Sequence, residues 1–225
     1  MNKTILAVLF TGALVTNAFS QTGGNVTFVA STTRPISYTL DEVNLTKVPV
    51  GNPAQIPGFG QVYVEAFGAA SGTTLNLDAF GVPNLSSWAP ATPTMSKVVP
   101  TPGFIPGTEL FMDLSLGPPG SIEQMEVVGW AGNYSSFADA VNAWESGAPN
   151  VLIGWNGNSL FPNQGALGWT QQTGTATSPA AMLVGSGGYN GVVLFEAPEP
   201  CTPVLAALTS GALLLFRRRA AVSRK

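Results

Sequence analysis

The side-chain types that carry most enzyme chemistry are nearly absent from this chain of 225 residues, which has no His and a single Cys, Cys201. Without His, a Ser-His-Asp triad, a Cys-His pair and a His-ligated metal site are all excluded. One Cys excludes an intrachain disulfide and a Cys-rich zinc site. We therefore expect a protein that is not an enzyme, with no catalytic residues, no cofactor and no metal site. Cys201 is interpreted as a small apolar side chain at a membrane edge rather than as a reactive thiol.

Carboxylates are the remaining groups that could perform acid–base chemistry, and two of them, Asp41 and Glu42, are adjacent. A hydrolase that uses carboxylates alone needs two of them facing each other across a cleft, about 5 to 10 Å apart. Two neighbouring acids after a predicted strand usually end that strand in solvent, and we favour this interpretation. A carboxylate hydrolase stays open as one hypothesis.

Aromatic side chains gather between residues 130 and 169, where Trp130, Trp155 and Trp169 are accompanied by Trp144 and Tyr134. If they were exposed on a sheet, Trp130, Trp155 and Trp169 could bind a ligand by stacking on sugar rings, as the aromatic side chains of carbohydrate-binding modules do. If they were buried, they would form part of the hydrophobic core. We favour burial and keep ligand stacking as the alternative.

Charge is scarce in this sequence and unevenly distributed. Charged residues make up 9% of the chain, against about 25% in an ordinary soluble domain. Residues 22–196 hold three cations and eleven acids, which gives this segment a net charge of −8. A binding surface for a phosphate backbone needs clustered cations, so we expect no nucleic-acid partner.

The N-terminus predicts export. Lys3 precedes an apolar run of about ten residues, and Ala18 and Ser20 place small side chains at positions −3 and −1 of a cleavage before Gln21. This order is typical of a secretory signal peptide, which we assign to residues 1–20 as a helix. The alternative is a short core helix.

The C-terminus predicts a membrane anchor. Residues 202–216 carry no charge and are mostly Ala, Leu and Val, and Arg217, Arg218 and Arg219 follow directly. As a transmembrane helix this run would be about 23 Å long, shorter than the hydrocarbon core of about 30 Å, but local thinning or Arg snorkelling can absorb the mismatch. The arginines then act as a stop-transfer signal and stay cytoplasmic. The alternative is a buried helix of a soluble domain.

The tail as a whole, residues 197–225, resembles a known sorting signal. Pro198, Glu199 and Pro200 stand directly before the apolar run and its basic end. This order resembles the PEP-CTERM signal of exported proteins in Gram-negative bacteria. The resemblance implies recognition by an exosortase, cleavage near the motif, and transfer to the outer surface or its polysaccharide. Two prolines would hold an extended backbone just outside the membrane, where a protease can bind it.

The resemblance also implies a route for the protein. We expect it to be exported, anchored transiently in the inner membrane before processing, and then released to the cell surface or the extracellular space. The expected partners are the exosortase, the inner membrane and extracellular polysaccharide.

Residues 21–196 are expected to form one β-rich domain. Short apolar alternations separated by Gly, Pro and Asn predict strands at 26–30, 36–40, 61–67, 108–116, 122–130, 151–155 and 191–196. A Gly-Pro-Pro-Gly turn at 117–120 lies between two of them, so we expect 108–116 and 122–130 to form a hairpin. Short strands with turn residues between them favour an all-β fold, a β-sandwich.

One short helix is expected to interrupt the strands. Ser136 can cap it, Gly147 ends it, and one face carries Phe137, Ala140, Val141 and Trp144. We expect this helix to cover one end of the sandwich. The predicted fold is thus an all-β sandwich with one short helix, flanked by the signal-peptide helix and the transmembrane helix.

Three functional hypotheses follow. The first is a non-catalytic cell-surface or extracellular-matrix protein that is sorted by its tail. The second is a carbohydrate- or ice-binding module displayed in the same way, which an exposed, coplanar set of rings would support. The third is the carboxylate hydrolase, which requires a cleft with two facing acids. Burial of the Trp cluster would support the first.

Overall fold

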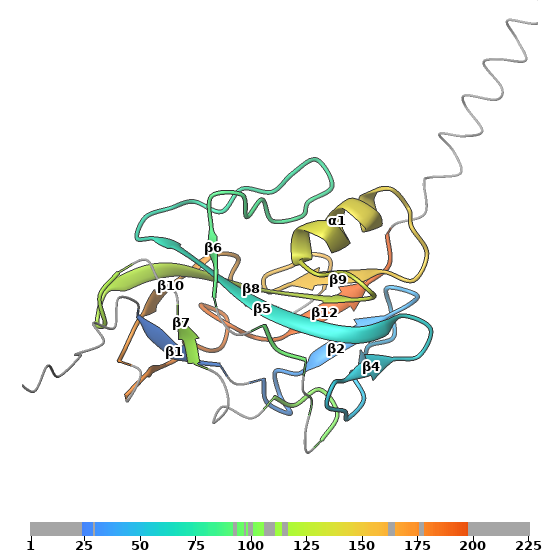
Figure 1. Ribbon diagram of the computed structural model, residues 1–225, viewed down its shortest axis with the longest axis horizontal. Coiled ribbons are helices and arrows are strands. Elements are labelled where there is room, and N and C mark those ends of the chain that lie inside the picture. The colour runs from blue at the N-terminus through green and yellow to red at the C-terminus, as the bar shows by residue number, and fades with distance from the viewer. Residues whose placement is uncertain are drawn as a thin grey trace, which may run out of the picture.

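In the computed structural model of the chain, the described residues are 24–28, 30–91, 94–96, 98, 101–105, 111–113, 117–161, 165–175 and 178–197. Within them the chain forms twelve strands and one helix (Figure 1). The strands are β1 (Asn25–Thr27), β2 (Ile36–Thr39), β3 (Thr46–Lys47), β4 (Gln55–Ile56), β5 (Gly60–Ala70), β6 (Ala89–Pro90), β7 (Phe111–Asp113), β8 (Ile122–Ala131), β9 (Leu152–Trp155), β10 (Trp169–Gln172), β11 (Ala180–Ala181) and β12 (Val192–Phe195). The helix is α1 (Phe137–Glu145).

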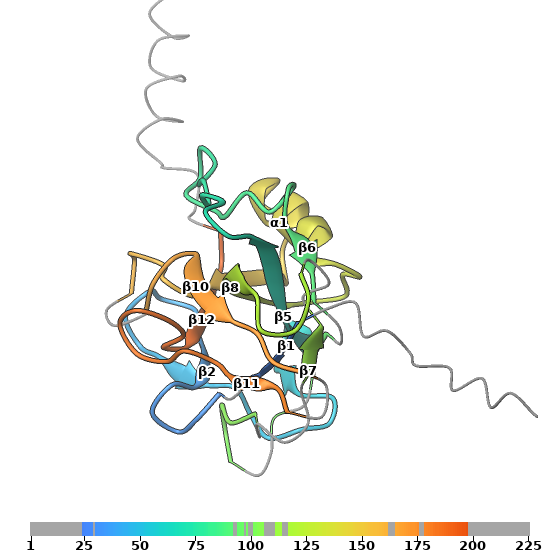
Figure 2. The same ribbon diagram turned by 90° about the vertical axis from the view of Figure 1, so that its left-hand side faces the viewer.

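Nine of these strands form one curled sheet with the order β3-β2-β12-β9-β8-β5-β4, in which β10 also pairs with β8 and β6 with β5 (Figures 1 and 2). Its centre is the antiparallel pair of the two longest strands, β5 and β8, in register from Val62 opposite Ala131 to Ala70 opposite Glu123. The last strand, β12, lies between β2, to which it is parallel, and β9, to which it is antiparallel. A smaller sheet has the order β11-β1-β7.

The main core lies between the two sheets. Strand β5 alternates along its length, so that Val62, Val64 and Ala66 point to the same face and are buried. They belong to one apolar cluster with Val26 and Phe28, which come from β1 of the small sheet and the residue after it. The small sheet therefore covers one face of the large sheet.

A second core lies on the opposite face of the large sheet. Here Trp130, Ile153 and Phe195, from β8, β9 and β12, are buried together with Phe137 and Trp144 of α1. The Trp144 ring packs edge-on against the Phe195 ring with 5.5 Å between their centres. Both faces of the central strands are thus apolar, which explains why β9 and β12 are buried at every residue.

A mostly β fold with one short helix is confirmed. Strands β5, β8, β9 and β12 occupy predicted stretches, and β2 lies inside the stretch at 36–40. The predicted hairpin is wrong, because β7, which lies inside 108–116, pairs with β1. Strand β8 offers it no edge: β5 occupies one side, and β9 and β10 share the other.

The helix is confirmed, but the expected position at one end of the fold is wrong. Ser136 caps it as predicted, since its hydroxyl accepts the Asp139 backbone N–H at 3.1 Å. The helix lies on a face of the large sheet, over β8 and β9 (Figure 1). The physical reason is that this face carries its own apolar side chains, which Phe137, Ala140 and Trp144 cover.

The two predicted flanking segments, the signal peptide at 1–20 and the membrane run at 202–216, lie outside the described residues. Among the residues that are described, no helix combines the length and the apolar character needed to cross a membrane.

Candidate functional site

The three tryptophans considered for ligand stacking lie in the interior. Trp130 is 1% exposed, and Trp155 and Trp169 are 3% exposed. Trp130 stacks on Tyr63 with 5.2 Å between ring centres, and Trp155 packs against Phe195 at 5.5 Å. None of the three rings offers a face to a sugar, so the stacking hypothesis is corrected and the core alternative is supported.

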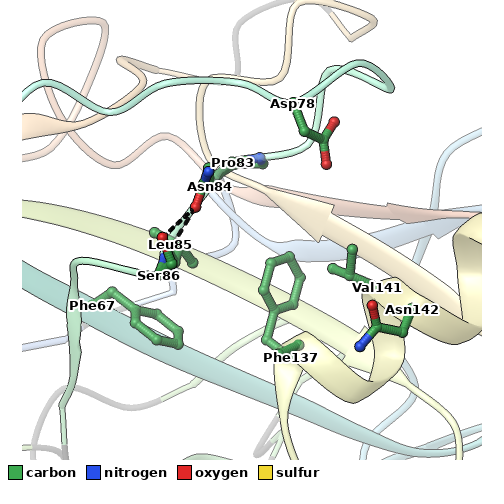
Figure 3. A pocket seen from close by; sticks show the side chains of 10 residues that line it. Phe67, Asp78, Pro83, Asn84, Leu85, Ser86, Phe137, Val141 and Asn142 are labelled. Carbon is green, nitrogen blue, oxygen red and sulfur yellow. Dashed lines mark hydrogen bonds between the residues drawn. The ribbon is translucent and has the colours of Figure 1, made fainter.

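A cavity lies elsewhere, between α1 and the loop that follows β5 (Figure 3). Its volume is about 310 Å³, at the lower end of the range for small-molecule sites. The apolar wall consists of Phe67 from β5, Pro83 and Leu85 from the loop, and Phe137 and Val141 from α1. In Figure 3 the Phe67 and Phe137 rings stand beside each other below the loop.

The loop over this cavity is held by short-range hydrogen bonds. The Asp78 carboxylate accepts the backbone N–H groups of Phe80 at 2.8 Å and Val82 at 2.9 Å. The Asn84 side-chain oxygen accepts the Ser86 hydroxyl at 2.8 Å and its backbone N–H at 3.2 Å. These turns give the loop a defined shape although it belongs to no sheet.

The polar rim of the cavity consists of Asp78, Asn84, Ser86 and Asn142. Asp78 also shares a hydrogen bond with Glu145, the last residue of α1. Partial burial, together with this bond and the charge of Asp78, raises the pKa of the Glu145 carboxyl. Two hydrogen-bonded carboxyl groups leave no space between them for a sugar bond and a water, so this pair lacks the spacing of a glycoside hydrolase site.

A shallower concavity of about 450 Å³ opens beside the start of α1, lined by Tyr63, Asn133, Tyr134, Ser135 and Asp139. The Asp139 carboxylate accepts the hydroxyls of Ser135 at 2.7 Å and Ser136 at 2.8 Å, and these bonds lower its pKa. The Asp139 carboxylate at this concavity therefore stabilises the first turn of the helix.

The adjacent acids Asp41 and Glu42 lie in solvent, as favoured from the sequence. The Asp41 carboxylate accepts the backbone N–H of Asn44 at 2.8 Å and of Val43 at 3.0 Å, and the Asn44 side-chain amide at 2.6 Å. The Asn44 bonds, followed by the Val43 bond, lower the pKa of Asp41 well below its usual range. Asp41 shapes a turn and does not face a second acid across a cleft.

Glu126 is a buried acid that sequence reasoning missed. It lies on β8 between the stretch that pairs with β10 and the stretch that pairs with β9. On that side the strand lacks a regular partner at Glu126, whereas Phe67 of β5 pairs with it on the other side. Its carboxylate accepts the N–H of Gly168 at 2.7 Å and of Val127 at 3.1 Å. In the sequence, the signal that could have identified Glu126 is an acid inside an apolar strand. Its role as a hydrogen-bond acceptor depends on Gly168, which is distant in sequence.

The chain leaves the described fold beside α1 and β2. The indole N–H of Trp144 donates to the carbonyl of Phe195 at 3.1 Å, which fixes the end of β12. Ala197 still packs against the helix-side core. The sorting motif Pro198, Glu199 and Pro200 begins at the next residue; it lies outside the described residues, as do Arg217, Arg218 and Arg219 and the cleavage-site residues Ala18, Ser20 and Gln21.

Comparisons with protein-family models, with curated proteins and with solved structures find no match to this chain.

Proposed function

We propose that this protein is an exported, tail-anchored substrate of an exosortase-type sorting system. The observation that carries the proposal is the order of the C-terminal residues: Pro198-Glu199-Pro200, an uncharged run and three arginines. The position of the motif supports it. The last described strand ends at Phe195, so cleavage near the motif would release a body whose described core is complete.

The route that we propose has two stages. The body is exported with the tail held in the inner membrane, and cleavage by the exosortase then moves the body to the cell surface or the extracellular polysaccharide. The body itself is proposed to be a non-catalytic β-sandwich that serves as a surface or matrix protein. Burial of Trp130, Trp155 and Trp169 supports this over ligand stacking by those rings. The hydrogen bond of Asp78 with Glu145 supports it over a glycoside hydrolase site at that pair.

The test of sorting is Glu199→Ala, measured by fractionation of the host cells and by intact-mass measurement of the tagged protein. Removing the acid of the motif is expected to leave full-length protein in the inner membrane, while the unaltered chain loses the residues after the motif. The matched control is Glu196→Ala, which removes an exposed acid three residues earlier. Normal processing of the Glu199→Ala chain would refute the exosortase assignment.

The cavity over Phe67 favours a second candidate function, a surface-displayed carbohydrate-binding module. The half-buried Phe67 ring, with amide and hydroxyl groups at the rim, suits a small ring with hydroxyl substituents. A glycan array would test this with the unaltered chain and with Ala138→Trp, which places a large ring at an exposed position of the cavity wall. Binding should be lost in Ala138→Trp and retained in Ala181→Trp, at an exposed alanine of the small sheet.

A further inference from the structure

The loop between β2 and β3 carries an unusual group of exposed apolar side chains. Leu40 is 55% exposed, Val43 78% and Leu45 48%, all within six consecutive residues. Single exposed apolar side chains are normal on a soluble protein, but several on one short loop mark a surface that another apolar phase covers. We call Leu40, Val43 and Leu45 the apolar loop.

The apolar loop lies at the edge where the chain leaves the fold. Strands β2 and β12 run parallel, with Thr39 opposite Phe195. Leu40 follows Thr39 as Glu196 follows Phe195, so the loop begins level with the exit of the tail. No other strand separates them, because β2 and β12 are direct neighbours in the sheet.

The length of the tail restricts where this edge can lie. From Ala197 to Thr202, where the uncharged run begins, the chain has five residue steps. Fully extended, these span at most about 18 Å. If the tail is anchored in a membrane, the exit edge therefore lies no more than about 18 Å from the hydrocarbon core. This distance spans one headgroup layer and a short gap.

The loop is also built to hold its shape. The Asp41 carboxylate accepts the N–H groups of Val43 and Asn44, which fixes the turn between Leu40 and Leu45. A fixed turn loses little conformational entropy when its apolar side chains enter an interface.

The charges around the loop define the kind of lipid. Asp41, Glu42 and Glu196 are exposed on this edge and Lys47 is the cation of β3. An anionic surface would repel this set, whereas a zwitterionic phospholipid surface would not.

From these observations we propose that the apolar loop rests in the headgroup region of the outer leaflet of the membrane that holds the tail. This proposal rests on the proposed function, because it needs the tail as an anchor. The body of the precursor would then sit on the bilayer in one orientation, with the sorting motif between them.

The experiment uses the full-length chain in phosphatidylcholine vesicles that contain brominated lipid. Cys201→Ser removes the native thiol, and Val43→Cys provides a single site for an environment-sensitive fluorophore. Ile122→Cys is the matched control, since Ile122 is 54% exposed but begins β8, about 30 Å from the end of that strand at Ala131 near the exit edge. We expect loss of most of the fluorescence at residue 43 and little loss at residue 122.

Two readouts separate the proposal from the function on which it rests. Flotation of the vesicles reports insertion of the tail, and fluorescence loss reports contact of the loop. If the protein floats but residue 43 is no more quenched than residue 122, the apolar loop does not touch lipid and the proposal is overturned. If the protein does not float, the anchor itself is wrong and the proposal falls with it. Leu45→Cys repeats the measurement at a second site and should agree with residue 43.

Discussion

Glu126 shows how one side chain can complete a sheet at a point where strand pairing changes. On the side away from β5, β8 pairs with β9 as far as Val128 and with β10 from Met125. Between them the Glu126 carboxylate accepts the N–H of Gly168, the residue before β10, at 2.7 Å. Burial raises the pKa of Glu126 well above its usual range, and the N–H groups of Gly168, Val127 and Asn156 offset only part of that rise.

This raised pKa predicts how stability depends on pH. The folded protein holds the Glu126 proton more tightly than the unfolded chain does. In the unfolded chain a Glu titrates at about pH 4.3. Its contribution to stability is therefore full below that pH and is lost as the pH rises through the folded pKa. We therefore expect the urea concentration at the unfolding midpoint to decrease as the pH is raised from 5 to 7. Glu126→Gln should flatten this slope, and an unchanged slope would show that Glu126 does not cause it.

Gly154 is a residue whose lack of a side chain allows β9 and β12 to approach each other closely. A Cβ at this position of β9 would overlap the backbone carbonyl of Val193 on the neighbouring strand. Gly154→Ala should therefore destabilise the body by about 3 kcal/mol, at the upper end for overpacking. Urea unfolding would measure it. The control is Gly187→Ala, where a Cβ meets nothing within 4 Å, and a change above about 0.5 kcal/mol there would be unexpected.

At the scale of elements, α1 depends on its first turn. The cap residue Ser136 has extended backbone angles, φ −146° and ψ 162°, and its hydroxyl accepts the Asp139 N–H. Ser136→Ala should cost about 1 kcal/mol of unfolding free energy, whereas Ser136→Asn should cost only a few tenths, because Asn caps equally well. Thermal or urea unfolding compares the two. Equal losses in both variants would mean that the cap bond does not stabilise the helix.

The elements themselves were largely predictable, since alternation and capping are local patterns. Strands β2, β5 and β8 and the cap at Ser136 follow from residues that are close in sequence. Their partners were not predictable in the same way. The pairing of β7 with β1 depends on which edges of β8 other strands have already occupied.

The cavity between α1 and the loop after β5 could not be predicted from the sequence, because its walls come from segments that are distant in the chain. The sequence pattern predicts correctly that Phe67 belongs to a strand. Its place in a cavity depends on the position of the loop with Leu85 next to α1 (Figure 3). No periodic pattern marks that loop. The burial of Trp130, Trp155 and Trp169 likewise depends on which face of each strand α1 and the small sheet cover, although the core interpretation was favoured.

At the scale of the whole molecule, we predict that the tail can be removed from the body without loss of the fold. The buried residues of the described fold lie between Gly24 and Phe195. A chain ending after Ala197 should therefore unfold cooperatively at the same urea concentration as the full-length protein in mild detergent. A chain ending after Gly191 lacks β12 and should not fold, as judged by circular dichroism and urea unfolding. A large loss of stability in the longer of these chains would show that the tail contributes to the core.

The place of β12 also has a consequence for how the protein is made. Because the last described strand lies between β2 and β9, the large sheet remains divided until residue 195 has left the ribosome. The uncharged run begins only seven residues later. On the route proposed above, the large sheet of the exported chain would close only after residue 195 has crossed the membrane, shortly before the uncharged run follows.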